Sequence, residues 1–325
     1  AEFIRLYCTR AKRWTSPKFI AGESYGTTRA AGLSGYLQDH LGIYLNGVIL
    51  ISAILNWQTV SDDRGNDLPY ALFLPSFAAA AWYHQRLASD LQRDLRTTLA
   101  EVEQFAAGDY TLALMQGSAL GEAERHGIAQ RLARYTGLSP EFIDRANLRV
   151  SMERFTKELL RAERRTLGRL DSRYLGIDSD AAGETFQFDA SYAAIQGPFT
   201  AALNDYVRRE LHFESDLPYE ILTGRVHPWS FGSSNRYLDV ADTLRSAMTQ
   251  NQALHVFVAG GYYDFATPYF AAQYTIDHMG IDPSLRGHLT FEHYEAGHMM
   301  YIHAPSLLKL KQDLVQFMHR ALANQ

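Results

Sequence analysis

The hydrophobic pattern of residues 1–74 alternates between helical and strand character. Apolar residues recur at helical spacing over residues 1–13, and a short apolar strand is predicted at 18–22. A helix predicted from about Thr27 leads to a β-branched apolar run at 46–54, which has the length of a buried strand. A strand, a helix and a second strand at this spacing predict a parallel crossover unit.

The pattern then becomes helical over residues 75–225. Leu and Phe recur at three- and four-residue spacings, which predicts long helices at 82–106 and 139–170. Ser139-Pro140-Glu141 is a typical helix start. The second predicted helix is rich in arginine, but interleaved glutamates favour a solvated helix face over a nucleic-acid surface. A helical block between strand-containing regions indicates an inserted cap.

Alternation returns in residues 226–325. The predicted elements are, in order, a buried strand and turn at 253–264, a helix at 267–280, a strand at 288–298 and a closing amphipathic helix at 304–324. The pattern therefore predicts an α/β fold. Residues 1–74 and 226–325 would form its core, and residues 75–225 the helical cap.

Composition excludes some classes of partner. The formal net charge of −5 gives no electrostatic reason to expect binding to nucleic acid or to an anionic membrane surface. No run of about 18 apolar residues is present, so no membrane-spanning helix is predicted. The lone Cys8 cannot form an internal disulfide, which fits a reduced compartment and equally a bacterial exported protein without bridges.

Three polar residues each follow a predicted strand: Ser24, Asp264 and His298. Ser24 lies in a Gly-x-Ser-x-Gly pattern, which is typical of a strained strand-to-helix turn, and the order Ser, Asp, His is that of the α/β-hydrolase fold. Parallel strands end at one edge of a sheet, so these side chains are expected to meet there. In such a group, the imidazole takes the serine proton and the carboxylate orients the imidazole. Taken alone, Asp264 could equally cap a helix.

Metal and cofactor sites are not predicted. His293, His298 and His303 are five residues apart, whereas a helical zinc pair needs a spacing of four. The glycine turn before Asp264 lacks the full Gly-x-Gly-x-x-Gly pattern of a dinucleotide site. We therefore expect no metal and no cofactor.

Several stretches together resemble the serine carboxypeptidase family, most closely its bacterial members. They are GESYG at 22–26, NDLPYALFLPSFAAAAWYH at 66–84, YAAIQGPFTAALNDYVRREL at 192–211, GGYYDFATP at 260–268 and EAGHMM at 295–300. The resemblance covers essentially the whole chain. It implies an α/β-hydrolase fold with a helical insertion and removal of C-terminal residues from peptides through an acyl-enzyme. It also implies a periplasmic or secreted location and a peptide partner with a free C-terminal carboxylate.

The resemblance assigns further roles around the nucleophile. Glu23 would belong to the group that holds the terminal carboxylate of the substrate. Two carboxylates bind each other only when they share a proton, so Glu23 is expected to be neutral, with a raised pKa. Substrate binding and activity are then expected to be favoured at acidic pH. The N–H of Tyr25 would be one oxyanion donor. Met299 would line the leaving-residue pocket, and Tyr263 and Tyr294 would be pocket walls or core. The alternative for Glu23 is a cap on the following helix, and for Met299 plain packing.

The family also has a second oxyanion donor, a second carboxylate-binding glutamate and an asparagine upstream of the nucleophile. Only 23 residues precede Ser24, so we expect the N-terminal strands to be missing, with an unpaired sheet edge and a possible partner in the missing segment or in a second chain. Two alternatives remain open: an esterase or acyltransferase on the same scaffold, and an inactive truncated hydrolase-like domain.

Overall fold

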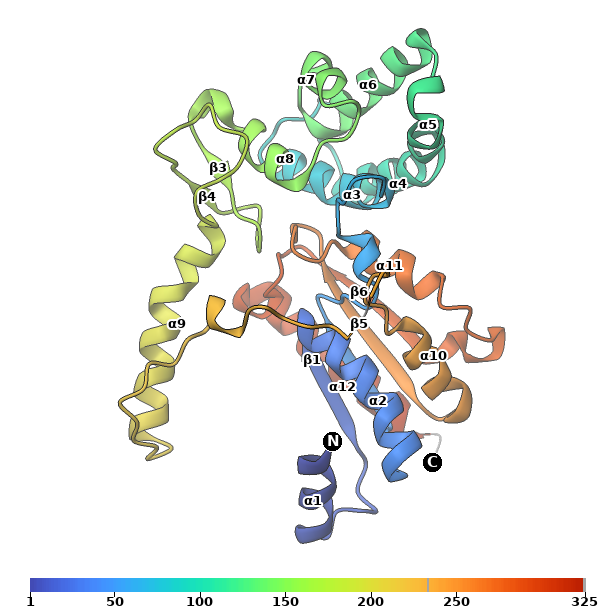
Figure 1. Cartoon of the computed structure of the whole chain (residues 1–325), viewed down its shortest axis with the longest axis vertical. Coiled ribbons are helices and arrows are strands. Elements are labelled where there is room, and N and C mark those ends of the chain that lie inside the picture. The colour runs from blue at the N-terminus through green and yellow to red at the C-terminus, as the bar shows by residue number, and fades with distance from the viewer. Residues whose placement is uncertain (233, 324–325) are drawn as a thin grey trace.

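The computed structural model describes residues 1–232 and 234–323. Its centre is a four-stranded, all-parallel sheet in the order β1-β2-β5-β6 (Figure 1). The strands are β1 (Phe19–Glu23), β2 (Gly47–Ile51), β5 (His255–Gly261) and β6 (Leu289–Tyr294). A small antiparallel pair, β3 (Thr166–Leu167) and β4 (Leu175–Gly176), lies apart from this sheet. The predicted α/β fold with a parallel sheet flanked by helices is confirmed.

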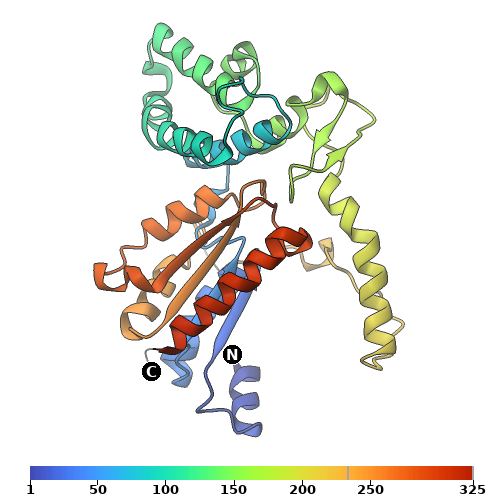
Figure 2. The same ribbon diagram turned by 180° about the vertical axis from the view of Figure 1, so that it is seen from behind.

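Strict alternation of side chains on the central strands creates two apolar layers. Leu50 and Val256 lie in a cluster with α2 (Tyr25–Leu41), α10 (Ala241–Gln250) and α11 (Tyr269–Asp277). Ile49 and Phe257 face the other way, in a cluster with α12 (Ala304–Ala323). Figures 1 and 2 show these helices on opposite faces of the sheet. Because β1 pairs only with β2 in the part of the chain described, it forms one edge of the sheet.

The remaining helices are α1 (Glu2–Arg10), α3 (Leu68–Tyr83), α4 (Leu95–Phe105), α5 (Thr111–Gln116), α6 (Glu122–Thr136), α7 (Pro140–Arg145), α8 (Met152–Glu158) and α9 (Ala190–Arg209). Helices α3 to α8 and the β3–β4 segment that follows them form a helical block above the carboxyl edge of the sheet (Figure 1). This block has its own core, in which Phe77 stacks on Phe155 with ring centroids 4.2 Å apart. No helix within residues 1–232 and 234–323 is long and apolar enough to cross a membrane.

Two predicted long helices are wrong. The 82–106 pattern contains the end of α3, a non-helical stretch and α4, because Asp94 accepts a hydrogen bond from Thr97 N at 2.8 Å and starts a new helix. The 139–170 pattern is divided in the same way. Ser151 adopts an extended conformation and accepts a hydrogen bond from Arg154 N at 3.3 Å. The apolar spacing therefore continues through both sites, but the helix itself is interrupted where a polar side chain caps a new one.

Helix α9 extends away from both the sheet and the helical block, and the chain then returns to α10 (Figure 1). Asp189 starts α9 by accepting a hydrogen bond from Ser191 N at 2.9 Å. On the return, Trp229 and Phe231 reach Tyr25 at the start of α2, with ring centroids 5.4 and 6.2 Å away. The returning segment therefore lies beside the end of β1.

Candidate active site

Ser24 is the single residue between β1 and α2. Its backbone has φ 56° and ψ −127°, a strained conformation for a residue with a side chain. Three hydrogen bonds hold it. Its N–H donates to the Ile51 carbonyl at 3.0 Å, and its carbonyl accepts from Thr27 N at 2.9 Å and from the Thr27 hydroxyl at 2.6 Å. The helix begins directly after it, at Tyr25, rather than near Thr27 as predicted. This turn carries the serine hydroxyl beyond the end of the strand.

The two glycines of the Gly-x-Ser-x-Gly pattern have different importance. A Cβ at position 22 would lie 2.1 Å from the carbonyl oxygen of Gly26, whereas a Cβ at position 26 would meet nothing within 4 Å. The first glycine lets the strand approach the first turn of α2. The second is not required by packing.

Asp264 and His298 form a direct pair. Nδ1 of His298 lies 2.7 Å from Oδ2 of Asp264, whose side chain is completely buried. Burial acts to lower the pKa of His298, but the Asp264 charge and hydrogen bond outweigh it, so the pKa is raised. Since a carboxylate only accepts, Nδ1 carries the proton and Nε2 remains free to accept one.

The Asp264 carboxylate is fixed by the turn that follows it. Oδ1 accepts hydrogen bonds from the backbone N–H groups of Ala266 and Thr267, at 2.7 and 3.0 Å. The Thr267 hydroxyl donates to Oδ2 at 2.8 Å. These bonds stabilise the ionised carboxylate and aim it at His298. Asp264 therefore orders the start of the α11 segment and contacts the imidazole at the same time.

The loop after β6 returns across the ends of two strands to reach β1. The hydroxyl of Ser52, just beyond β2, donates to the His298 carbonyl at 2.6 Å. Further along the loop, the Tyr301 hydroxyl donates to both oxygens of Glu23, at 3.0 and 2.9 Å. The structure thus brings the His298 loop to the residue before Ser24. Within residues 1–232 and 234–323, the Ser24 hydroxyl itself makes no hydrogen bond to His298.

Glu23 is half-buried at the end of β1. Burial raises the pKa of its carboxyl above the ordinary value, and the Tyr301 hydrogen bond opposes this only in part. The helix-cap alternative for Glu23 is wrong, since α2 has no side-chain cap and the carboxylate is bound to Tyr301.

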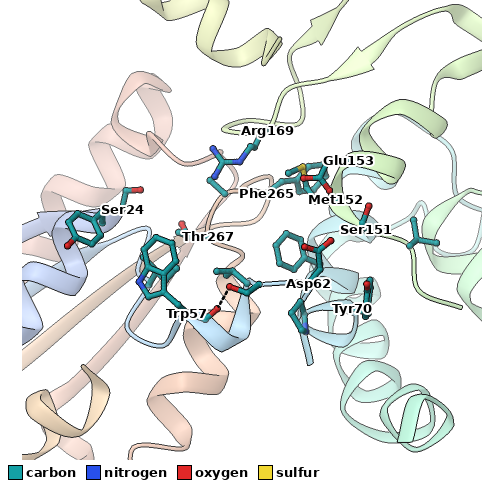
Figure 3. Close-up of a pocket in the computed structure, with 18 residues that line it drawn as sticks. Ser24, Trp57, Asp62, Tyr70, Ser151, Met152, Glu153, Arg169, Phe265 and Thr267 are labelled. Atoms are coloured by element: carbon teal, nitrogen blue, oxygen red, sulfur yellow. Dashed lines mark hydrogen bonds between the residues drawn. The ribbon is translucent and has the colours of Figure 1, made fainter. Parts of the chain in front are cut away.

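A pocket of about 280 Å³ borders Ser24 (Figure 3). It lies between the carboxyl edge of the sheet and the helical block, and its lining combines aromatic, aliphatic, hydroxyl and charged side chains. The aromatic residues are Tyr25, Trp57, Tyr70, Phe73 and Phe265, and the charged ones are Asp62, Glu153 and Arg169. Glu23 and His298 do not line it, so the pocket extends from Ser24 in a direction away from the Glu23–Tyr301 contact.

Residues 168–173, from the helical block, hold both loops of the Asp264–His298 pair. The carbonyl of Leu170 accepts a hydrogen bond from His298 N at 2.7 Å, and that of Arg169 accepts one from Phe265 N at 3.0 Å. The carboxylate of Asp171 accepts one from Gly297 N at 3.2 Å. The geometry of the pair therefore depends on a segment of the helical block. Sequence reasoning missed this segment, because most of its bonds come from the main chain and leave no pattern of residue types.

The other predicted site residues lie at different places around Ser24 and His298. Tyr25 is the first residue of α2, where a backbone N–H has no acceptor within the helix and is free to face a ligand. Met299 is half-buried beside His298 and does not line the Ser24 pocket. Tyr263 and Tyr294 are buried and do not line that pocket either. Thr267 and Tyr301 were missed; each lies three residues after a predicted catalytic residue.

No group of three or more His, Cys, Asp or Glu side chains is arranged to hold a metal ion in the described ranges 1–232 and 234–323. No protein-family model, no curated protein and no solved structure matches this chain.

Proposed function

We propose that the chain is a serine hydrolase with an α/β-hydrolase fold and a helical cap, and that it acts as a serine-type carboxypeptidase. Ser24 is the nucleophile, His298 the general base and then acid, and Asp264 the residue that orients His298. The Asp264–His298 hydrogen bond of 2.7 Å, held beside a strained serine turn, carries the proposal. Residues 1–74 and 226–325 form the hydrolase core in this proposal, and residues 75–225 the cap.

The reaction begins when Nε2 of His298 takes the proton of the Ser24 hydroxyl, whose oxygen attacks the last peptide carbonyl. The backbone N–H of Tyr25 donates to the oxygen of the tetrahedral intermediate. His298 then gives its proton to the leaving amine, and the acyl group stays on Ser24. A water molecule, deprotonated by His298, releases the shortened peptide and regenerates the serine.

Glu23 favours an exopeptidase over a general esterase. It lies directly before the nucleophile, and its raised pKa keeps part of it protonated on the acidic side of neutrality. A protonated Glu23 donates a hydrogen bond to the terminal carboxylate of the substrate, which an ionised Glu23 would repel. The partner is then a peptide with a free C-terminus, and the site of action is periplasmic or secreted.

Labelling with a fluorophosphonate probe tests the nucleophile. The full chain is expected to be labelled on Ser24, and Ser24→Ala is expected to abolish labelling. A well-folded chain that is not labelled would favour an inactive hydrolase-like domain. The observation that favours this inactive alternative is that Ser24 and His298 form no hydrogen bond in the described ranges.

Matched substrates then separate the two enzymatic candidates. We expect cleavage of an N-blocked dipeptide with a free carboxylate and at least tenfold slower cleavage of the same dipeptide with a C-terminal amide, since about 1.4 kcal/mol in the barrier is a factor of ten. Equal rates for both, together with faster cleavage of a simple ester, would identify an esterase.

A further inference from the structure

Arg169 places an unpaired cation in the Ser24 pocket. Its side chain is half-buried and lines the pocket, and it forms no hydrogen bond or ion pair with any residue in the described ranges 1–232 and 234–323. A guanidinium stays protonated in proteins, so the charge cannot be removed by burial. The site is therefore suited to an anion that accepts two parallel N–H bonds, such as a carboxylate.

The backbone of Arg169 is held firmly. Its N–H donates to Oδ1 of Asp189 at 2.9 Å, and its carbonyl accepts from Phe265 N at 3.0 Å. Phe265 directly follows Asp264, so the arginine is tied to the same loop as the catalytic carboxylate. These bonds fix the backbone position from which the guanidinium enters the pocket.

The position of the pocket indicates which part of a peptide would meet Arg169. In the proposed reaction the terminal carboxylate lies at Glu23, and the leaving residue lies there with it. The pocket borders Ser24 but neither Glu23 nor Tyr301. The residue on the acyl side of the scissile bond therefore points into the pocket, where Arg169 lies.

We propose that Arg169 binds the side-chain carboxylate of this acyl-side residue, so that the enzyme prefers peptides whose penultimate residue is Asp or Glu. The inference rests on the proposed carboxypeptidase function and specifies its substrate class. The aromatic walls would contact the methylene groups of the side chain, and the guanidinium would bind its carboxylate.

Two acidic residues also line the pocket and oppose this preference. Figure 3 shows Ser24 at one side of the pocket, Asp62 and Glu153 at the other, and Arg169 between them. Asp62 is exposed, so water and salt screen its charge strongly. Glu153 is half-buried and is therefore the stronger competitor for the preference that Arg169 gives.

Three N-blocked dipeptides test the proposal. They share a C-terminal alanine and differ only in the acyl-side residue, which is Glu, Gln or Lys. For the unmodified chain we expect kcat/KM for Glu to exceed that for Gln about tenfold. Arg169→Gln should bring this ratio close to one, and Arg169→Glu should make Lys the better substrate. Arg164→Gln, which removes an exposed arginine from the same block, is the control and should leave the ratio unchanged.

Other outcomes would overturn the proposal. Equal rates for Glu and Gln in the unmodified chain would show that the pocket does not select an acid. An equal loss on all three substrates in Arg169→Gln would mean that Arg169 acts on a group they share, such as the terminal carboxylate. If Ser24 is not labelled and no dipeptide is cleaved, the carboxypeptidase function itself fails. Calorimetric binding of N-acetyl-Glu and N-acetyl-Gln to Ser24→Ala tests Arg169 without catalysis, and no difference in affinity would refute the inference.

Discussion

The Tyr301 hydroxyl donates to both carboxylate oxygens of Glu23, at 3.0 and 2.9 Å. This contact joins the residue before Ser24 to the loop that carries His298. When ionised, Glu23 raises the pKa of His298, and under the proposed function it would also repel the terminal carboxylate of the substrate. Glu23 is therefore expected to control the pH dependence of the enzyme.

Two titrations define this pH dependence. Glu23 works when protonated, so activity falls as pH rises through its raised pKa. His298 works as a base when neutral, so activity falls as pH decreases through its own raised pKa. Because the active form needs a protonated Glu23 and a neutral His298, the profile of kcat/KM for a free-acid dipeptide should be bell-shaped. Beyond each pKa, activity falls about tenfold per pH unit.

Glu23→Gln should abolish the fall in activity at high pH, because a glutamine amide donates a hydrogen bond at every pH. It should also move the acidic limb to lower pH, because the Glu23 charge that helps to raise the pKa of His298 is gone. Tyr301→Phe is the companion variant. The Tyr301 bond favours the ionised carboxylate, so its removal should raise the pKa of Glu23 and increase kcat/KM on the alkaline side of the profile. An unchanged alkaline limb in both variants would rule out Glu23 as the titrating group.

Asp264→Asn should lower kcat by about 10⁴ while leaving the fold intact, because the amide no longer fixes the proton on Nδ1 of His298. Thr267→Val removes one hydrogen bond to the Asp264 carboxylate, observed at 2.8 Å. Hydrogen bonds to charged groups contribute about 1.5–3 kcal/mol, so this variant should lose about 10- to 100-fold. Steady-state kinetics on one dipeptide measure both. If the loss in Thr267→Val adds in full to that of Asp264→Asn in the double variant, Thr267 does not act through Asp264.

The sequence predicted the sheet and the ends of its strands better than it predicted the helical block. Apolar β-branched runs such as residues 46–54 are specific for buried strands, and the structure has β2 there. Since parallel strands end at one edge, the spacing alone also indicated that Asp264 and His298 would approach each other, and they are 2.7 Å apart. The sequence could not show where helices break inside the 139–170 pattern, because Ser151 caps a helix through a local bond that apolar spacing does not reveal.

The parts of the site that were missed depend on long-range contacts. Leu170 holds His298 through its carbonyl, which every residue type has. The hydroxyl of Ser52, just beyond β2 and 246 positions away in sequence, donates to the carbonyl of the same residue. Arg169 was one of several arginines in a pattern that favoured a solvated face, and only the fold places it in the pocket. Such residues are recognised once the topology is known.

The glycines around Ser24 give a paired test of the strained turn. Gly22→Ala places a Cβ 2.1 Å from the Gly26 carbonyl oxygen, so the strand and the helix must separate. We expect a loss of about 2–3 kcal/mol in the free energy of unfolding and loss of probe labelling at Ser24. Gly26→Ala meets nothing within 4 Å in a helical position and should be neutral or stabilising by up to about 1 kcal/mol. Denaturant unfolding measures both, and equal effects would contradict this distinction.

Lys157 and Asp178 form an ion pair whose side chains are each only 2% exposed, with an Nζ–Oδ2 distance of 2.7 Å. Lys157 also donates to the Asp180 carbonyl at 2.6 Å, so the pair attaches the segment between β4 and α9 to α8. Lys157→Met leaves a buried carboxylate without its cation, with only the hydrogen bond from Gln187 N at 3.3 Å, and should cost about 3–5 kcal/mol, seen as a lower denaturation midpoint. The double variant Lys157→Met/Asp178→Leu removes both charges and should recover most of this loss. If the double variant is as unstable as the single one, the cost comes from lost packing and not from the unpaired charge.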